Sequence, residues 1–144
     1  MEAWAGPAES IFAEGRNWGR FRAAAYTLSM PLKDRISFLT SPTEVDGFLK
    51  ANPTAAIFKA GICHKTQETF AHVQAHLDPR EDLKLGIIKV VEARPASNHV
   101  AAMTGIEHES PQIILFKDGK NVFDRDNWDI TSDAMSEGLK AVSA

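Results

Sequence analysis

The residue best suited to chemistry in this 144-residue chain is Cys63, the only cysteine in the sequence. It lies between an apolar stretch at residues 55–59, typical of a buried strand, and a stretch at residues 65–77 with helical periodicity. The unpaired N–H groups and the dipole of a helix N-terminus stabilise a thiolate, and the neighbours His64 and Lys65 add cationic character. We therefore expect a reactive thiol at this position. The alternative is an inert cysteine that packs as a small hydrophobic side chain.

The spacing around Cys63 predicts a monothiol mechanism. Thr66 stands three residues after Cys63, where a dithiol motif would have its second cysteine. With no second thiol, Cys63 can form no intramolecular disulfide and no cysteine-cluster metal site, and it cannot resolve its own mixed disulfide. The Thr66 hydroxyl can still offer a hydrogen bond to the sulfur. We expect no metal site, and we interpret Glu68, His72 and His76, which recur along one helix face, as a solvated face.

A second candidate feature is the pair Ser110-Pro111, directly before the apolar stretch at residues 112–116. Proline is tolerated at the first residue of a strand, so the pair can simply mark the start of a strand. Alternatively, the bond between the two residues is cis and faces Cys63 across the end of the sheet. In that arrangement the backbone ahead of Pro111 can pair with an extended peptide or a thiol substrate.

Three further residues, His108, Glu109 and Trp128, are considered as parts of the site. His108 and Glu109 either shape the same site or, in the case of His108, bond only to the backbone. We interpret Trp128 as a cover for the edge of the core rather than as a substrate contact.

The elements that position these residues follow from the patterning beyond Arg35. Apolar and β-branched runs predict strands, and periodic apolar residues between start and stop signals predict helices. The expected strands cover residues 36–39, 55–59, 85–91, 112–117 and 120–124, and the expected helices cover residues 41–50, 65–77, 96–103 and 131–142. β-α-β units imply parallel strands joined by right-handed crossovers, and the turn at Asp118-Gly119 adds an antiparallel edge. This predicts an α/β protein with a central mixed sheet flanked by helices, in the element order of a thioredoxin-like fold.

Helix ends are marked by residues that supply hydrogen bonds to unpaired backbone groups. Ser41 with Glu44 three residues later predicts a capping box. Ser97 is expected in the cap of the third helix, which Gly105 closes, and Thr131 is expected to cap the last helix.

Composition bounds the protein class. The chain is 44% hydrophobic and 24% charged, with a net charge of −3, which is typical of a globular protein and argues against a generally basic nucleic-acid face. No apolar run is long enough to span a membrane, and the N-terminus lacks the pattern of a signal peptide, so we expect a cytoplasmic protein. We expect two parts, an N-terminal extension at residues 1–30, helical or partly disordered, and a thioredoxin-like domain at residues 31–144.

The chain from Ile36 onward resembles the monothiol bacilliredoxin family, the thioredoxin-like proteins of the bacillithiol system. The matching pieces are Phe58-Lys59, Cys63-x-x-Thr66, Ser97-Asn98 with Val100-Ala101, Gly105-Ile106-x-His108-Glu109-Ser110-Pro111-Gln112, Phe116-Lys117-Asp118-Gly119 and Trp128-Asp129-Ile130-Thr131. Two positions depart from the family pattern. His64 replaces the proline after the cysteine, and Thr66 replaces a serine and keeps its hydroxyl.

The resemblance implies a thioredoxin fold, a cis bond at Pro111 and one catalytic cysteine, Cys63. It implies no bound cofactor, with a low-molecular-weight thiol such as bacillithiol as co-substrate and proteins carrying mixed disulfides as partners. The residues expected to bind substrate are Lys59, His64, Lys65, Thr66, Ser110 and Pro111. Lys59 is expected to meet a carboxylate of the small thiol, or else to lie in solvent at the strand end. Nucleic-acid and membrane partners are not expected, and the protein is expected to be a monomer or a weak dimer.

The leading functional hypothesis is therefore a monothiol thiol-disulfide oxidoreductase that removes a low-molecular-weight thiol from protein mixed disulfides through Cys63. The main alternative is a non-catalytic thioredoxin-like binding module or redox sensor in which Cys63 is only modified. A carrier of an iron–sulfur cluster is a third alternative, which would need an external thiol ligand and a dimer.

Overall fold

The computed structural model describes residues 30–144, and residues Pro31–Ala144 form one compact unit. Of the predicted extension at residues 1–30, all but Met30 lies outside the described residues. In chain order the elements are η2 (Leu32–Arg35), β1 (Ile36–Phe38), α2 (Pro42–Ala51), β2 (Ala55–Ala60), α3 (His64–Leu77), β3 (Lys84–Lys89), α4 (Arg94–Thr104), β4 (Gln112–Lys117), β5 (Lys120–Asp126), η3 (Asn127–Asp129) and α5 (Ser132–Ser143). Each predicted strand and helix from residue 36 onward is present, with shifts of a few residues at the ends.

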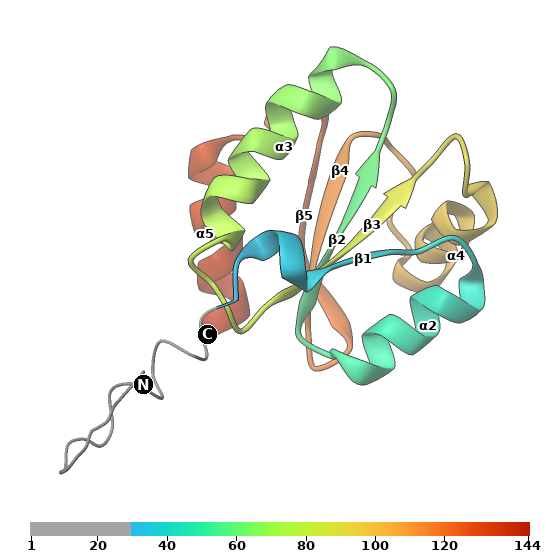
Figure 1. The fold of residues 1–144 in the computed structure, drawn as a ribbon, viewed down its shortest axis with the longest axis horizontal. Coiled ribbons are helices and arrows are strands. Elements are labelled where there is room, and N and C mark those ends of the chain that lie inside the picture. Colours follow the sequence, from blue (N-terminus) through green and yellow to red (C-terminus); the bar gives the residue numbers. More distant parts are fainter. Residues whose placement is uncertain (1–29) are drawn as a thin grey trace, which may run out of the picture. The chain divides into compact units, whose positions relative to one another are not determined.

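The five strands form one mixed sheet in the order β1-β3-β2-β4-β5 (Figure 1). β1, β3 and β2 are parallel, whereas β4 is antiparallel to both β2 and β5. The implication that β-α-β units give parallel strands is thus wrong for the unit that contains α4. The chain leaves the sheet at the end of β3 and re-enters it beside the end of β2, where Lys59 pairs with Gln112. α4 and the loop after it therefore bring the chain back to the same end of the sheet, and β4 runs in the direction opposite to β2.

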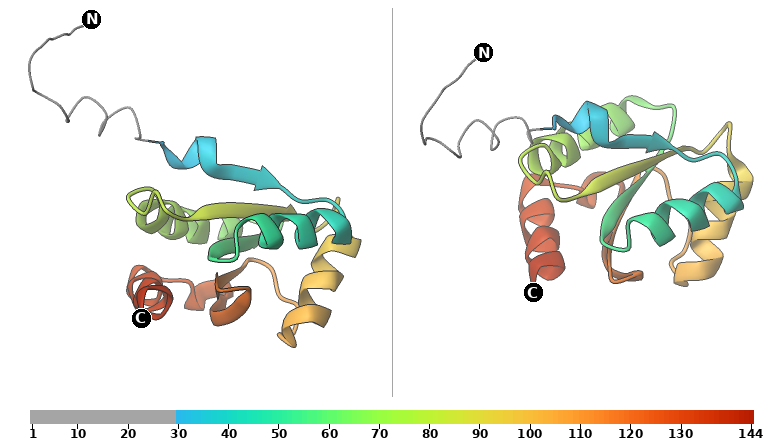
Figure 2. Two further views of the ribbon diagram at one scale, coloured as in Figure 1. Left: turned by 90° about the horizontal axis from the view of Figure 1, so that it is seen from below. Right: turned by 60° about the horizontal axis from the view of Figure 1, so that its bottom comes forward.

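Two helices cover each face of the sheet. α3 and α5 lie together on one face, and α2 and α4 lie together on the other, as the two views of Figure 2 also show. Successive residues of a strand point to opposite faces, so β2 supplies Ala56 and Phe58 to the α3–α5 side, and Ala55 and Ile57 to the α2–α4 side. The central strands are apolar on both faces because both faces are covered.

The helix starts are partly as predicted. Ser41 accepts a hydrogen bond from the Glu44 N–H at 3.1 Å, and Thr131 accepts one from the Ala134 N–H at 3.1 Å, which confirms both caps. The predicted cap of the third helix is wrong, because α4 begins at Arg94, three residues before Ser97, with Pro95 in its first turn. Ser97 is instead buried inside this helix.

Arg35 joins the first elements of this unit to the rest of it. Its side chain is buried, and its guanidinium donates hydrogen bonds to the backbone carbonyls of Leu77, Asp78, Arg80 and Leu83 at 2.7–3.2 Å. These carbonyls lie at the end of α3 and in the turn before β3. The guanidinium therefore adds hydrogen bonds to carbonyls around the end of α3, where those of Leu77 and Arg80 also accept from the N–H groups of Arg80 and Leu83.

No helix among the described residues is long and apolar enough to cross a membrane.

Candidate active site

Cys63 is the N-cap residue of α3, between the end of β2 at Ala60 and the first helical residue His64. Its backbone is extended, with φ −90° and ψ 165°, and its thiol is exposed. The thiol lies at the end of the helix whose N–H groups are unpaired and whose dipole is positive, as the sequence predicted.

The first turn of α3 lowers the pKa of the Cys63 thiol. The largest cause is a hydrogen bond from the Thr66 backbone N–H, and the Lys65 backbone N–H and the Thr66 hydroxyl also favour the thiolate. Partial desolvation acts in the opposite direction but is the smaller effect. A thiol in this position is therefore more easily ionised than a free one, which favours nucleophilic attack.

Thr66 holds the loop that carries the cysteine. Its Oγ1 accepts a hydrogen bond from the Gly61 N–H at 3.0 Å, so the hydroxyl proton remains available to the sulfur. The space around Gly61 is narrow, because a Cβ there would lie 3.2 Å from Thr66 Oγ1 and 3.3 Å from Ser110 Oγ. Gly61 thus allows the loop before Cys63 to pass between Thr66 and Ser110.

The Ser110–Pro111 peptide bond is cis, and Pro111 is buried. Ser110 lies against the Cys63 loop at Gly61, so the segment before β4 and the segment after β2 are neighbours at one end of the sheet. The structure therefore brings together Cys63, Thr66, Ser110 and Pro111, which the sequence had placed in one site.

His64 and Lys65 take different positions although they are adjacent. The His64 side chain is 78% exposed, and its Nε2 lies 4.0 Å from a carboxylate oxygen of Glu68. The Lys65 Nζ donates a hydrogen bond to Asn127 Oδ1 at 2.9 Å and lies 5.8 Å from the centroid of the Trp128 ring. The ammonium of Lys65 thus has a partner within the protein, whereas His64 is open to a substrate.

Trp128 belongs to this region rather than to the core. It is 53% exposed, and its ring centroid lies 6.3 Å from that of His64. The interpretation of Trp128 as a cover for the core edge rather than a substrate contact stays a prediction. Ile130, two residues later, is the buried residue of this segment.

Lys59 does not reach the surface of the site. Its side chain is fully buried, and burial lowers its pKa to about 8. Both expectations for Lys59 placed its ammonium in solvent or at a substrate carboxylate, and the structure supports neither. The reason is the strand alternation, which turns Lys59 toward the face covered by α4.

Lys59 is part of a polar cluster in which Lys59, Ser97 and Gln112 are buried and His108 is exposed. The Nδ1 atom of His108 lies 3.3 Å from Lys59 Nζ and 3.0 Å from Ser97 Oγ. Burial, and next the Lys59 charge, lower the pKa of His108, so the neutral ring can accept hydrogen bonds at Nδ1. His108 therefore bonds to side chains rather than to the backbone.

Gln112 completes this cluster from β4. Its Nε2 donates to the carbonyl of Glu107 at 3.1 Å, while its buried Oε1 has no hydrogen-bond partner among the described residues. Sequence reasoning missed Gln112 and Ser97 as members of a polar cluster. The signal available was a lysine and a glutamine in two otherwise apolar strands, because buried polar side chains need partners.

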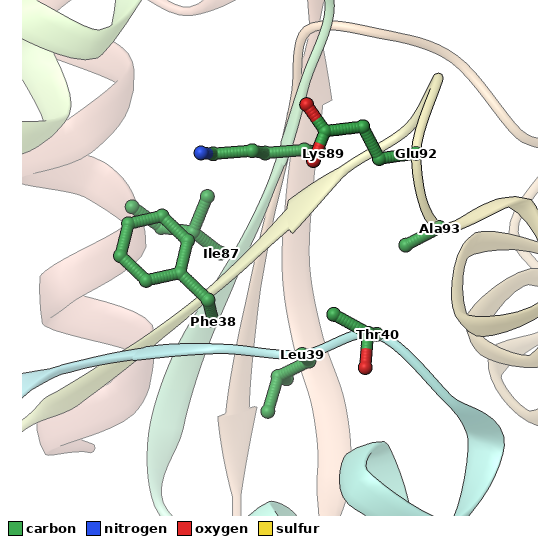
Figure 3. Close-up of a pocket in the computed structure, with 7 residues that line it drawn as sticks. All are labelled: Phe38, Leu39, Thr40, Ile87, Lys89, Glu92 and Ala93. Carbon is green, nitrogen blue, oxygen red and sulfur yellow. The ribbon is translucent and has the colours of Figure 1, made fainter.

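A small pocket lies apart from these residues, between the ends of β1 and β3 (Figure 3). It is lined by Phe38, Leu39, Thr40, Ile87, Lys89, Glu92 and Ala93. None of the residues predicted for the Cys63 site lines it. Within residues 30–144 there is also no group of three or more histidine, cysteine, aspartate or glutamate side chains that could hold a metal ion.

The fold is similar to that of solved thioredoxin-like proteins. One, a protein with a thioredoxin fold, has a TM-score of 0.68 at 23% identity, covering 75% of this chain and 96% of that chain. Mitochondrial thioredoxin 3 of Saccharomyces cerevisiae has a TM-score of 0.59 at 21% identity, covering 73% and 93%. A variant thioredoxin of Halobacterium salinarum has a TM-score of 0.60 at 20% identity, covering 76% and 92%. These similarities establish a thioredoxin fold, as the element order predicted.

The family is established by a comparison of sequence. The family described as monothiol bacilliredoxin BrxC matches residues 37–135, which is more than half of the chain and includes Cys63, Thr66 and Pro111. Family and fold together support a thiol-oxidoreductase-like role. The chain belongs to the monothiol bacilliredoxin family.

Proposed function

We propose that this protein is a monothiol thiol-disulfide oxidoreductase that removes a low-molecular-weight thiol from protein mixed disulfides through Cys63. The observation that carries the proposal is the exposed thiol at the N-terminus of α3, with a lowered pKa, in a loop that lies at Gly61 against Ser110 of the cis Ser110–Pro111 bond. A thiolate that is both accessible and stabilised is what an attack on a disulfide requires.

The reaction has two exchange steps. The Cys63 thiolate attacks the sulfur of the small thiol in the mixed disulfide, the client thiolate leaves, and a disulfide between Cys63 and the small thiol remains. A second small thiolate then attacks this disulfide on the small-thiol side. It releases a symmetric small disulfide and the Cys63 thiolate, so no other oxidant or reductant is needed.

The residues around the thiol have defined parts in this proposal. The N–H groups of the first turn and the Thr66 hydroxyl stabilise the sulfur when it is the nucleophile and again when it is the leaving group. In this proposal His64 and the backbone of Ser110 and Pro111 contact the incoming disulfide. Lys65 also lies at this binding site. Lys59 takes no direct part, because its ammonium is buried.

The remaining expectations belong to the same proposal. The small thiol is bacillithiol or a thiol of similar chemistry, no cofactor is bound, and the clients are proteins with an exposed mixed disulfide. The reaction suits a reducing compartment, for which we propose the cytoplasm, and a monomer or weak dimer is sufficient for it.

The test uses a client protein that carries one bacillithiol mixed disulfide. We expect the wild-type protein to release the client thiol and to gain the mass of one small thiol at Cys63, and we expect Cys63→Ala to do neither. Equal release by wild type and Cys63→Ala would contradict the proposal. A Cys63 adduct that forms but is not removed by added small thiol would instead identify a redox sensor.

A further inference from the structure

Asn127 has an unusual backbone conformation. Asn127 and Asp118, with φ of 50° and 53°, are the only residues other than glycine in the described part of the chain that have positive φ. Asp118 forms the tight turn between β4 and β5 together with Gly119, where this conformation is required. Asn127 closes no hairpin, because it follows β5 and begins η3. The left-handed conformation costs free energy outside glycine, so its presence here indicates a local constraint.

The hydrogen bonds of Asn127 identify this constraint. Its backbone N–H donates to the Pro111 carbonyl at 2.9 Å, and its Oδ1 accepts from Lys65 Nζ at 2.9 Å. Its Nδ2 donates to Asp126 Oδ1 at 3.0 Å and to Glu109 Oε1 at 3.3 Å. Every polar group of the side chain therefore has a partner, and the partners come from both segments that border Cys63.

We propose that Asn127 is a positioning residue, which holds the loop at residues 105–111 against the first turn of α3 and so sets the gap in which the mixed disulfide must bind. The inference rests on the proposed function, because it assigns a role within that same site. Lys65 lies two residues after Cys63, and Pro111 carries the cis bond beside it. Because Asn127 bonds to both, one side chain and its backbone N–H fix the separation of these two segments.

The proposal predicts an effect on geometry and not on the thiol. None of the hydrogen bonds that lower the pKa of Cys63 comes from Asn127. Exchange with a protein disulfide needs the attacking, central and leaving sulfurs in line, and small errors in orientation slow such reactions strongly. A small alkylating reagent reacts with the thiolate without being aligned by the loop of residues 105–111.

The experiment compares Asn127→Gly with Asp118→Gly in the full-length protein. Both substitutions keep a residue that accepts positive φ and remove only the side chain, and Asp118 lies at the opposite end of the sheet, beside Thr54. We expect Asn127→Gly to slow release of a client thiol from its mixed disulfide by about tenfold or more. We expect its rate of alkylation by iodoacetamide and the pH midpoint of that reaction to stay at the wild-type values. Asp118→Gly should change none of these quantities.

A double variant tests the contact itself. Lys65→Met removes the same hydrogen bond from the other side, so the double variant of Lys65→Met and Asn127→Gly should be slowed less than the product of the two single effects. The proposal is overturned if Asn127→Gly releases the client thiol at the wild-type rate. It is also overturned if the rates of client release and of alkylation fall by the same factor, because the substitution would then act on the thiol itself.

The proposal can be separated from the proposed function. If the wild-type protein itself releases no client thiol, the oxidoreductase proposal fails, and amide hydrogen exchange then decides the role of Asn127. Faster amide hydrogen exchange at residues 106–110 in Asn127→Gly, but not in Asp118→Gly, supports the positioning role. An unchanged rate of amide hydrogen exchange at those residues overturns it.

Discussion

The Cys63 thiolate depends on hydrogen bonds from a single helical turn, so one side chain can be tested in isolation. Thr66→Val removes the hydroxyl and keeps the shape, and the backbone N–H of residue 66 remains in place. We expect the pKa of Cys63 to rise but to stay below that of a free thiol, because the largest contribution is from the backbone. The pH dependence of iodoacetamide alkylation measures this change, with its midpoint moving to higher pH in the variant.

Thr66→Ser is the matched control for this prediction. Serine keeps the hydroxyl that accepts from the Gly61 N–H at 3.0 Å and faces the sulfur, so its alkylation midpoint should match that of wild type. If the valine and serine variants have the same midpoint, the hydroxyl does not contribute to the acidity of Cys63.

The buried ammonium of Lys59 lowers the free energy of unfolding by an amount that depends on pH. Burial lowers its pKa to about 8 in the folded protein, whereas in the unfolded chain the lysine keeps its proton to its ordinary pKa of 10.5. Between these values the unfolded state binds more protons, so the free energy of unfolding rises as pH increases from about 8 to 10.5. Below pH 8 the full cost, roughly 3 kcal/mol, is present.

The prediction is that Lys59→Met stabilises the protein near neutral pH. The substitution removes the buried charge and keeps an apolar chain of similar length, so we expect a gain of about 1–3 kcal/mol at pH 7 that shrinks toward pH 10. Urea unfolding of wild type and variant at both pH values gives the difference, which cancels the titration of other groups. A variant that is less stable than wild type at pH 7 would contradict the assignment of a buried charge.

At the scale of elements, two helical glycines differ in what surrounds them. Gly138 lies in α5 where the helix meets the sheet, and a Cβ there would lie 2.6 Å from the Phe123 ring and 2.8 Å from a Leu115 methyl group. Gly138→Ala should therefore destabilise the protein by about 1–3 kcal/mol through overpacking. Chemical denaturation measures this loss.

Gly47 in α2 is the control for helix propensity, because nothing lies within 4 Å of a Cβ placed there. Gly47→Ala should stabilise the protein by roughly 0.5–1 kcal/mol. A loss of stability in Gly47→Ala, or no loss in Gly138→Ala, would show that close packing of α5 on β4 and β5 is not the reason for glycine at position 138.

The elements themselves could largely be predicted, because their signals are local. The cap at Ser41, the turn at Asp118-Gly119 and the position of Cys63 ahead of α3 each follow from residues within one turn or one hairpin. Of the predicted site residues, Thr66 and Ser110 both lie against Gly61 in the loop before Cys63, and Ser110 precedes the cis bond to Pro111. That result depended on the element order, since the strand ends bring the two loops to the same end of the sheet.

The features that could not be predicted depend on packing between distant segments. Lys59 follows four apolar residues and reads as a strand end, but the antiparallel entry of β4 buries it beside Gln112. Asn127 looks like an ordinary loop residue in the sequence, because its hydrogen bonds to Lys65, Glu109 and Pro111 join it to segments up to 62 residues away. Neither burial nor such contacts leave a local pattern in the sequence.

At the scale of the molecule, the boundary of the folded unit is open to test. Both hydrophobic clusters are built from residues between Leu32 and Val142, and the Leu32 N–H donates to the Asp78 carboxylate at 3.0 Å. A variant that begins at Met30 keeps all these contacts. We expect it to unfold cooperatively, with a stability within about 0.5 kcal/mol of the full-length protein and an unchanged rate of Cys63 alkylation.

A shorter variant that begins at Ile36 gives the contrast. It lacks the buried Leu32 and the Arg35 guanidinium, and so leaves four backbone carbonyls at the end of α3 and before β3 without that donor. The Leu77 and Arg80 carbonyls keep a second donor, the N–H groups of Arg80 and Leu83. Loss of the hydrogen bonds from the guanidinium and of the buried Leu32 side chain should still cost several times more than the first truncation. Urea unfolding of the two variants places the start of the domain between residues 30 and 36 if only the shorter one is destabilised. Unfolding of the variant that begins at Met30 would show instead that residues 1–29 are part of the domain.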